Sequence, residues 1–183
     1  MNMRIVLSLI LSSTLLLSGC SAFLFSLGSN PEMTLSNIKL MENTTKLKVP
    51  AIPPGTKDGE YLRYYPGGQI KYKSWVTKGC FDRYVNAYYE NGKLQMIIPL
   101  KNCEVNGVVK SYQTNGNIYS EIAMRNGLPH GAFKYYHNTP KNNVNLQGYI
   151  ENKALIGVIT QYDENGKVIN KGQVLDGKVK ILK

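Results

Sequence analysis

Beyond Asp58 the chain repeats itself with a nearly constant period, and this repetition constrains the fold more than any other feature. Tyrosine recurs at intervals of 24, 24, 24 and 26 residues, at Tyr64, Tyr88, Tyr112, Tyr136 and Tyr162. A glycine stands five residues before each tyrosine, except that Arg83 takes this place in the second copy. A second glycine follows four of the five tyrosines by four residues. A period of this length indicates one small supersecondary unit that is stacked several times.

Each copy has the sequence pattern of a β-hairpin. Asn91-Gly92, Asn115-Gly116 and Asn165-Gly166 are dipeptides that favour two-residue type I′ turns, because both central residues of such a turn have positive φ. The flanking segments, such as residues 84–89 and 94–98, are rich in aromatic and β-branched residues. The fourth copy differs by two extra residues within the stretch 137–143. We therefore expect an all-β fold, an elongated single-layer antiparallel meander of about five hairpins.

The first twenty residues have the pattern of an export signal. Arg4 precedes an apolar run over residues 5–17 that is too short to span a membrane, and the run leads into the tetrad L-S-G-C at residues 17–20. This tetrad resembles the lipobox of bacterial lipoproteins, which implies lipidation at Cys20. An ordinary secretory signal or a short membrane anchor is the alternative. The sequence thus predicts a signal peptide at 1–19, a lipid-anchored tether at 20–57 and a repeat domain at 58–183.

The predicted compartment limits the partners that the charge can attract. By resemblance to Gram-negative lipoproteins, the absence of Asp after Cys20 implies anchoring in the outer membrane, facing the periplasm. The chain has 22 Lys and Arg against 12 Asp and Glu, a formal charge of +10. Nucleic acid is not an expected partner in the envelope, so the charge favours anionic lipid headgroups or an acidic protein. Because the lysines are scattered, an evenly solvated surface is the alternative.

The repeat itself resembles a known family. The pattern G-x-x-x-x-Y-x-x-N-G-x-(I/L/V), as in GVVKSYQTNGNI at 107–118 and GVITQYDENGKV at 157–168, resembles the MORN repeat (membrane occupation and recognition nexus). It is similar in particular to the variant found in bacterial YwqK-like antitoxin proteins. The resemblance covers roughly residues 58–180. It implies an elongated sheet that binds a partner and does not catalyse a reaction, and it leaves open whether that partner is a lipid or a protein.

The aromatic residues fall into two predicted groups. The five recurring tyrosines are expected to stack on their equivalents in neighbouring copies as a structural ladder. Successive residues of a strand point to opposite faces, so a tyrosine next to a recurring one lies on the other face of the sheet. Aromatic residues on a less buried face suit protein recognition, although cross-strand packing is the alternative. The candidate partner-binding residues are Tyr65, Trp75, Tyr89, Tyr119, Tyr135 and Tyr149.

The sequence offers little for catalysis, and we expect no enzyme activity, no cofactor and no metal site. The cysteines Cys20, Cys80 and Cys103 form no C-x-x-C pair, and His130 and His137 lie seven residues apart, so zinc-finger spacing is absent. The carboxylates are too dispersed to argue for a general acid and base pair. Asp58 and His130 stand at turn-like positions, where bonding to the backbone is their expected role.

A disulfide between Cys80 and Cys103 is predicted from strand register. If Asn91 and Gly92 are the two loop residues, every opposed pair in that hairpin has residue numbers that sum to 183, and so do Cys80 and Cys103. Directly opposed residues are close enough for a disulfide, which an oxidising periplasm favours. Pro99 lacks an N–H and could break the ladder before the cysteines are reached. Two free, packed thiols are the alternative.

Two functions from different classes fit these observations. The first is a protein-binding immunity or antitoxin lipoprotein that neutralises a toxin acting in the periplasm or on the membrane, such as a secreted effector. The second is a structural or anionic-lipid-binding lipoprotein of the envelope.

Overall fold

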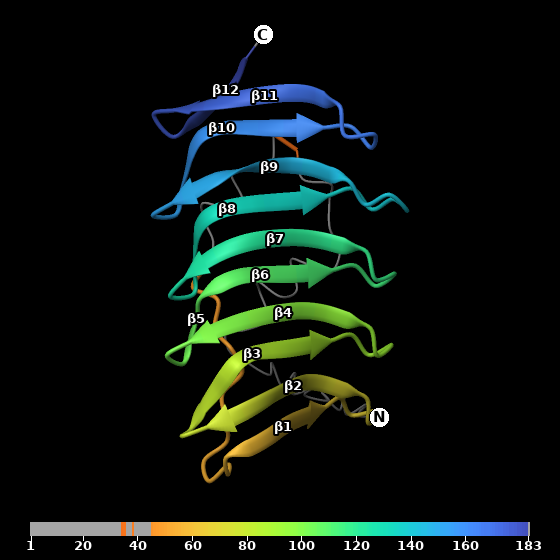
Figure 1. Cartoon of the computed structure of the whole chain (residues 1–183), viewed down its shortest axis with the longest axis vertical. Helices are drawn as coiled ribbons and strands as arrows, with labels where there is room; N and C mark the ends of the chain where they lie inside the picture. Colours follow the sequence, from red (N-terminus) through yellow and green to blue (C-terminus); the bar gives the residue numbers. More distant parts are fainter. Residues whose placement is uncertain (1–33, 36–37, 39–44, 183) are drawn as a thin grey trace, which may run out of the picture.

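The computed structural model describes residues 34–35, 38 and 45–182. In this part of the chain twelve β-strands form one open antiparallel sheet, and no α-helix occurs. Figure 1 shows the strands as the rungs of an elongated ladder in sequence order, except that the short fifth strand lies off this path and the sixth strand pairs with the fourth. The prediction of an all-β, single-layer meander of hairpins is therefore confirmed.

The strands follow the 24-residue period. They are β1 (Gly59–Tyr64), β2 (Ile70–Thr77), β3 (Cys80–Tyr88), β4 (Leu94–Lys101), β5 (Glu104–Val105), β6 (Gly107–Tyr112), β7 (Ile118–Arg125), β8 (Leu128–Tyr136), β9 (Val144–Glu151), β10 (Ala154–Tyr162), β11 (Val168–Leu175) and β12 (Lys178–Leu182). The short β5 pairs with β4 and is separated from β6 only by Asn106. Together β5 and β6 occupy the place that one strand fills in the other copies.

The Asn-Gly turns have a different form from the one that the sequence predicts. In the second copy Tyr89 N donates to Lys93 O and Gly92 N donates to Tyr89 O, both at 2.9 Å, which closes a three-residue loop. Gly92 has positive φ and Asn91 does not. The Asn91 side chain instead accepts a hydrogen bond from Lys93 N, an Asx turn that fixes the loop. The prediction of type I′ geometry at these dipeptides is wrong, because a side-chain oxygen accepts from the backbone N–H that follows the glycine. This oxygen belongs to Asn91 or Asn115 in the second and third copies and to Asp163 in the fifth.

Two-residue turns with two positive φ values do occur, at the opposite edge of the sheet. They join one repeat to the next, and Figure 1 shows them at the left-hand ends of the strands. Their central residues are Lys78-Gly79, Asn102-Cys103, Asn126-Gly127, Asn152-Lys153 and Asp176-Gly177. Two of these pairs contain no glycine, so this series of turns has a weaker sequence signature than the Asn-Gly series.

The Cys80–Cys103 disulfide is present, with Cα atoms 5.3 Å apart. Cys80 and Cys103 face each other because two departures from the expected hairpin cancel. The three-residue loop places Tyr88 opposite Leu94, a sum of 182, and a bulge next to this pair restores 183 from Ala87–Met96 onwards. Pro99 pairs with Tyr84 as the last pair of this ladder, so the ladder reaches the proline in register and ends there, before the cysteines. The pairing prediction is confirmed, although the turn geometry used to derive it is wrong.

One face of the sheet is covered by the chain's own N-terminal part. This inner face carries fully buried side chains such as Val76, Val85, Ile98, Phe133, Leu146 and Ile159. Its cover is the N-terminal strap, which we define as the described residues before Asp58, and the strap side chains that join the core or pack against it are Leu35, Ile38, Leu47, Val49 and Ile52. Figure 1 shows residues 45–58 running across several strands of the sheet, towards β1. The predicted tether is therefore packed on the repeats in its described part.

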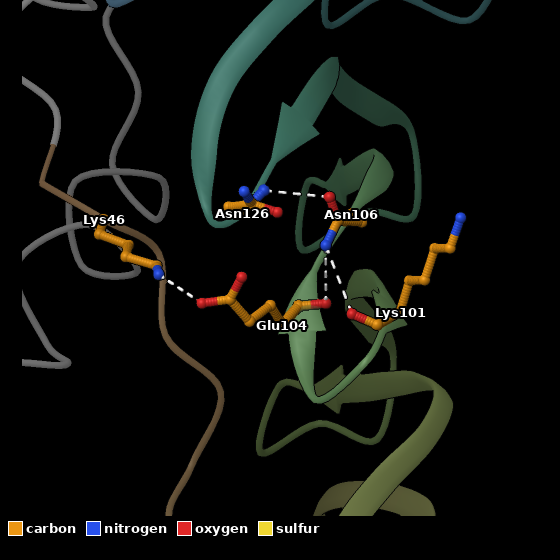
Figure 2. Close-up of polar contacts among 5 residues, drawn as sticks. All are labelled: Lys46, Lys101, Glu104, Asn106 and Asn126. Carbon is orange, nitrogen blue, oxygen red and sulfur yellow. Dashed lines mark hydrogen bonds and ion pairs between the residues drawn. The ribbon is translucent and has the colours of Figure 1, made fainter.

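The strap is fixed where β5 breaks off from β6. Leu47 N donates to Gly127 O at 2.7 Å, and a Cβ on Gly127 would lie 2.7 Å from Leu47 O, so glycine allows this close approach. Lys46 Nζ pairs with Glu104 at 2.7 Å, as Figure 2 shows. Figure 2 also shows Asn106 joining two neighbouring turns, because its amide bonds Lys101 O and Glu104 O while its oxygen accepts from Asn126 N. Buried Leu47 contributes more than the exposed ion pair, which is worth at most about 1 kcal/mol.

We predict that removing the disulfide lowers stability by about 3 kcal/mol, because the cross-link no longer restricts the unfolded chain. The measurement is denaturant unfolding of the oxidised protein and of a Cys80→Ser/Cys103→Ser double variant. Adding reductant should shift the unfolding midpoint of the parent protein and leave the double variant unchanged. Two reactive thiols in denatured, unreduced protein isolated from the periplasm would contradict the pairing.

We predict that Leu47→Ala destabilises the full chain by about 2–5 kcal/mol, since it opens a cavity between the strap and the sheet. Leu175→Ala is the matched control, because Leu175 is exposed, and this change should stay within about 0.5 kcal/mol. Thermal or denaturant unfolding of both variants makes the comparison. Equal effects of the two substitutions would show that the strap adds nothing to the fold.

Candidate binding surface

The face opposite the strap, the open face, carries a row of exposed apolar side chains. Trp75 is 55% exposed, Tyr84 48%, and Val108, Tyr149 and Val158 are each 46% exposed. In every case the next residue along the strand is buried on the inner face: Val76, Val85, Val109, Ile150 and Ile159. The strict alternation of a β-strand therefore separates a buried apolar face from an exposed apolar row.

Cross-strand register brings these residues into line. Tyr84 pairs with Pro99 and Ala132 pairs with Tyr149. Pro99 lies against Gly107, where an added Cβ would come within 3.1 Å of its ring, and Val108 is the next residue. The exposed apolar row, defined as Trp75, Tyr84, Pro99, Val108, Ala132, Tyr149 and Val158, thus extends from β2 to β10. Apolar surface of this extent on one face is typical of an interaction site.

A column of lysines runs beside the exposed apolar row. Lys110 pairs with Glu121 across β6 and β7, and Glu121 pairs with Lys134 of β8 in the strand register. The Lys110 Nζ to Glu121 Oε1 distance is 2.9 Å, and Lys73 Nζ lies 2.9 Å from Glu60 Oε1. With Lys171 on β11 the column holds four lysines and two glutamates, so it is net positive. A partner with acidic groups beside an apolar strip would complement it.

Two of the recurring tyrosines make hydrogen bonds that link neighbouring copies, whereas the stacking of the five tyrosines as a ladder stays a prediction. Tyr136 Oη donates to Glu121 Oε2 at 2.9 Å, and Gln147 Nε2 donates to Tyr162 Oη at 2.6 Å, each bond spanning 15 residues. Bonding to Lys110 and to Tyr136 holds the pKa of Glu121 below its ordinary value. Burial and the bond to Glu121 raise the pKa of Tyr136 to about 12. These bonds hold neighbouring repeats in register.

Four of the six predicted partner-binding aromatics do not belong to an exposed surface. Tyr65 Oη and Tyr89 Oη donate to the backbone oxygens of Tyr88 and Tyr112, at 2.8 and 2.7 Å, and so bridge successive copies. Tyr119 and Tyr135 are buried against each other, with ring centroids 5.4 Å apart. The expected exposure of both is wrong. The bulge after Tyr112–Ile118 leaves Tyr119 unpaired and both Tyr119 and Ser120 buried, whereas Tyr135 pairs with buried Ser120 and Leu146 on the inner face.

Trp75 and Tyr149 are exposed, and both lie in the exposed apolar row. Sequence reasoning missed Tyr84, Val108 and Val158 as surface residues. The sequence could have indicated that Val108 and Val158 are exposed, since each directly follows a glycine of the repeat, Gly107 and Gly157. Tyr84 follows Arg83, which stands in the same column.

Two further sequence predictions concern Cys20 and Asp58. Cys20 lies outside the described residues, so its lipidation stays a prediction. Asp58 Oδ1 accepts from Lys78 N at 2.8 Å, the backbone role expected for it.

In the described part of the chain no three His, Cys, Asp or Glu side chains gather as metal ligands would. The same part contains no helix with the length and apolar character needed to cross a membrane.

The MORN repeat variant family matches the chain in four segments, residues 57–74, 85–102, 105–126 and 155–176. The chain carries MORN-variant repeats. The copy between the last two matches is the one with the longer turn at 137–143. This bears out the MORN part of the sequence resemblance, and the matched segments coincide with the hairpins of the sheet.

Curated proteins include no match to this chain. Solved structures that are similar to this chain include the following two. One is the Glycosylation Associate Protein (Gap123) complex from Streptococcus agalactiae, at 14% identity and a TM-score of 0.37, covering 71% of this chain and 24% of that one. The other is accessory secretory protein 1,2 and 3 in Streptococcus pneumoniae, at 11% identity and a TM-score of 0.32, covering 79% of this chain and 23% of that one.

We predict that the folded protein loses stability as the pH rises from about 10 to about 12. Burial raises the pKa of Tyr119 to about 12 and, together with the bond to Glu121, that of Tyr136 to about 12. Groups with a raised folded pKa stabilise the fold below the unfolded value, near 10, and lose this contribution as pH rises through the folded value. Tyr136→Phe should flatten the fall in unfolding free energy across this range. A parallel curve for that variant would contradict the prediction.

Proposed function

We propose that this chain is a non-catalytic envelope lipoprotein that binds a protein partner through the open face of its repeats, and that it serves as an immunity protein against a periplasmic or membrane-directed toxin. The observation that carries the proposal is the exposed apolar row on the open face. Trp and Tyr are enriched among binding hot spots, and the row contains Trp75, Tyr84 and Tyr149.

The architecture supports binding through the open face. The strap occupies the inner face, so that face has no free apolar surface of comparable extent in the described residues. The open face is held rigid by cross-strand pairs and by the tyrosine hydrogen bonds between copies. A preformed surface loses little conformational entropy on binding, which favours a tight complex.

The proposed class of partner and its compartment rest on features of the sequence. The L-S-G-C tetrad supports lipid anchoring at Cys20, and Ser21 in place of Asp after it supports the outer membrane. The resemblance to YwqK-like antitoxins supports an immunity role. A toxin that the protein neutralises would present an apolar strip flanked by acidic groups, matching the exposed apolar row and the lysine column. A secreted effector is the class of toxin that reaches this compartment from outside the cell.

The second candidate is a protein that binds anionic lipid through the lysine column. Lys73, Lys110, Lys134 and Lys171 lie on one face, which favours contact with phosphate groups. Two of the four are already paired with Glu60 and Glu121, which weakens this candidate. Binding to anionic vesicles that disappears at high ionic strength, without capture of a protein, would favour it over the immunity role.

The direct test is capture of a partner by the full mature chain from envelope extracts, combined with attack by kin cells on bacteria that lack the chain. We expect one protein to be retained at high salt and the deletion strain to be killed, with protection restored by the parent gene. Recovery of phospholipid alone, together with normal survival of the deletion strain, would overturn the immunity role.

We predict that a negative charge in the exposed apolar row abolishes capture. Val108→Glu and Val158→Glu each place a carboxylate in the row and should weaken partner binding by at least about tenfold, because a charge is costly to desolvate in an interface. Val168→Glu is the matched control, since Val168 is similarly exposed but lies outside the row. If all three variants retain the partner equally, the row is not the binding surface.

We predict that Cys20→Ala releases the protein from the membrane fraction or leaves the signal peptide uncleaved. Acyl chains anchor a protein because each buried methylene contributes about 0.8 kcal/mol. Detergent partitioning and the mass of the mature protein are the measurements. Unchanged partitioning and unchanged mass in the variant would contradict lipid anchoring.

A further inference from the structure

A hollow on the open face lies at the β1–β3 end of the exposed apolar row. Its volume is about 330 Å³, which lies within the range of about 300–1,000 Å³ for small-molecule sites. The lining combines two exposed aromatic rings with polar and charged groups from three strands: Glu60, Lys73, Ser74, Trp75, Asp82, Arg83, Tyr84 and Asn86. The hollow therefore offers flat apolar surface and hydrogen-bonding groups together.

The repeat pattern is broken at this hollow. Arg83 stands where the other four copies have glycine, and its φ is +62°, a conformation that costs a residue with a Cβ about 1 kcal/mol or more. In the third and fourth copies the glycine lies under a neighbouring side chain, because a Cβ would come within 3.1 Å of Pro99 at Gly107 and 2.8 Å of Ala123 at Gly131. In the second copy a long, exposed side chain replaces this close packing at the rim of the hollow.

The hollow also contains an unmet hydrogen-bonding requirement. Asn86 Oδ1 is buried and has no hydrogen-bond partner among the described residues. A buried acceptor without a donor costs free energy, and a ligand that supplies a donor removes this cost. Ser74 does not meet the need, because its hydroxyl donates to Tyr84 O at 2.7 Å. A ligand group that pairs with this acceptor carries an O–H or N–H.

The charges in the hollow select a neutral ligand. Glu60 is paired with Lys73 at 2.9 Å, and Arg83 Nε lies 3.9 Å from Asp82 Oδ2. An incoming cation would meet Lys73 and Arg83, and an incoming anion would meet Glu60 and Asp82, so a net charge of either sign gains little. A neutral ring with hydroxyl groups on its edge and C–H groups on its face satisfies the polar lining and stacks on the aromatic rings.

We infer that this hollow is a saccharide-binding site, in which the ring of a neutral hexose or N-acetylhexosamine stacks on Trp75 and Tyr84, and a hydroxyl or amide group donates to Asn86 Oδ1 once the lining side chains shift to expose this buried atom. Arg83 and Asp82 bond further hydroxyls at the rim. Trp75 and Tyr84 also belong to the exposed apolar row, so the site overlaps one end of the proposed protein contact, although its test does not depend on that contact. It would let the protein hold a glycan at one end of the sheet.

The test uses the intrinsic fluorescence of the full mature chain, because Trp75 is its single tryptophan. The probes are glucose, galactose, N-acetylglucosamine and their β-linked disaccharides, and a neutral peptide, acetyl-Gly-Phe-Gly-amide, is the competing class. We expect a saturable change in Trp75 emission with at least one saccharide at micromolar to millimolar concentration. A flat response to every saccharide, or saturation by the peptide alone, would overturn the inference.

Variants separate the hollow from the remainder of the open face. Asn86→Leu removes the acceptor at similar side-chain size and should weaken saccharide binding by about tenfold or more. Arg83→Gly restores the residue of the other copies, so it should raise the thermal unfolding midpoint and weaken binding severalfold. Trp75→Ala, followed by calorimetry because the fluorophore is gone, should abolish binding.

Tyr149→Ala is the matched control, since Tyr149 is a similarly exposed aromatic of the same row on the distant strand β9. It should bind saccharide as the parent protein does. The assignment of the site would be overturned if Tyr149→Ala and Asn86→Leu lost saccharide affinity equally. It would also be overturned if Asn86→Leu and Arg83→Gly both bound saccharide as tightly as the parent protein. Circular dichroism of each variant checks that the sheet is retained.

Discussion

The contact between the N-terminal strap and the inner face of the sheet is the interaction on which the rest of the structure depends. A single-layer sheet has two faces and no second sheet to cover either of them, so one apolar face must be buried by another part of the chain. Leu35, Ile38 and Leu47 provide this cover, and Leu47 is also hydrogen-bonded through its backbone to Gly127. Because the strap takes the inner face, the open face is the one left for partners.

Contacts along the sheet connect each repeat to its neighbours. Tyr65 and Tyr89 bond the backbone of the next copy, while Tyr136 bonds back to Glu121. Such nearest-neighbour coupling is how repeat proteins distribute stability along their length. It also means that a departure in one copy stays local. Arg83 is such a departure, and the hollow beside it is consistent with a site added to one repeat without disturbing the others.

The strand register shows how a correct prediction can rest on an incorrect step. A two-residue Asn-Gly turn would bring Cys80 opposite Cys103 directly. The three-residue loop shifts the pairing by one residue, and the bulge after Tyr88–Leu94 shifts it back. The same shift recurs beside Tyr64, Tyr112, Tyr136 and Tyr162, so it belongs to the repeat and not to one hairpin. The bulge also explains why Tyr119 is buried, which strict alternation does not predict.

The sequence by itself determined the hairpin repeat, its 24-residue period, the single sheet and the cysteine pair, because these depend on turn residues and on pairing between segments close in the chain. Only the tertiary structure decided which face is open, which aromatics reach solvent and where a hollow forms. The side chains of Tyr135 and Tyr149 have similar chemistry, yet one is buried and the other exposed. That difference depends on the strap and on the bulges. Local periodicity encodes neither the path of a distant segment across a sheet nor an added residue in a strand.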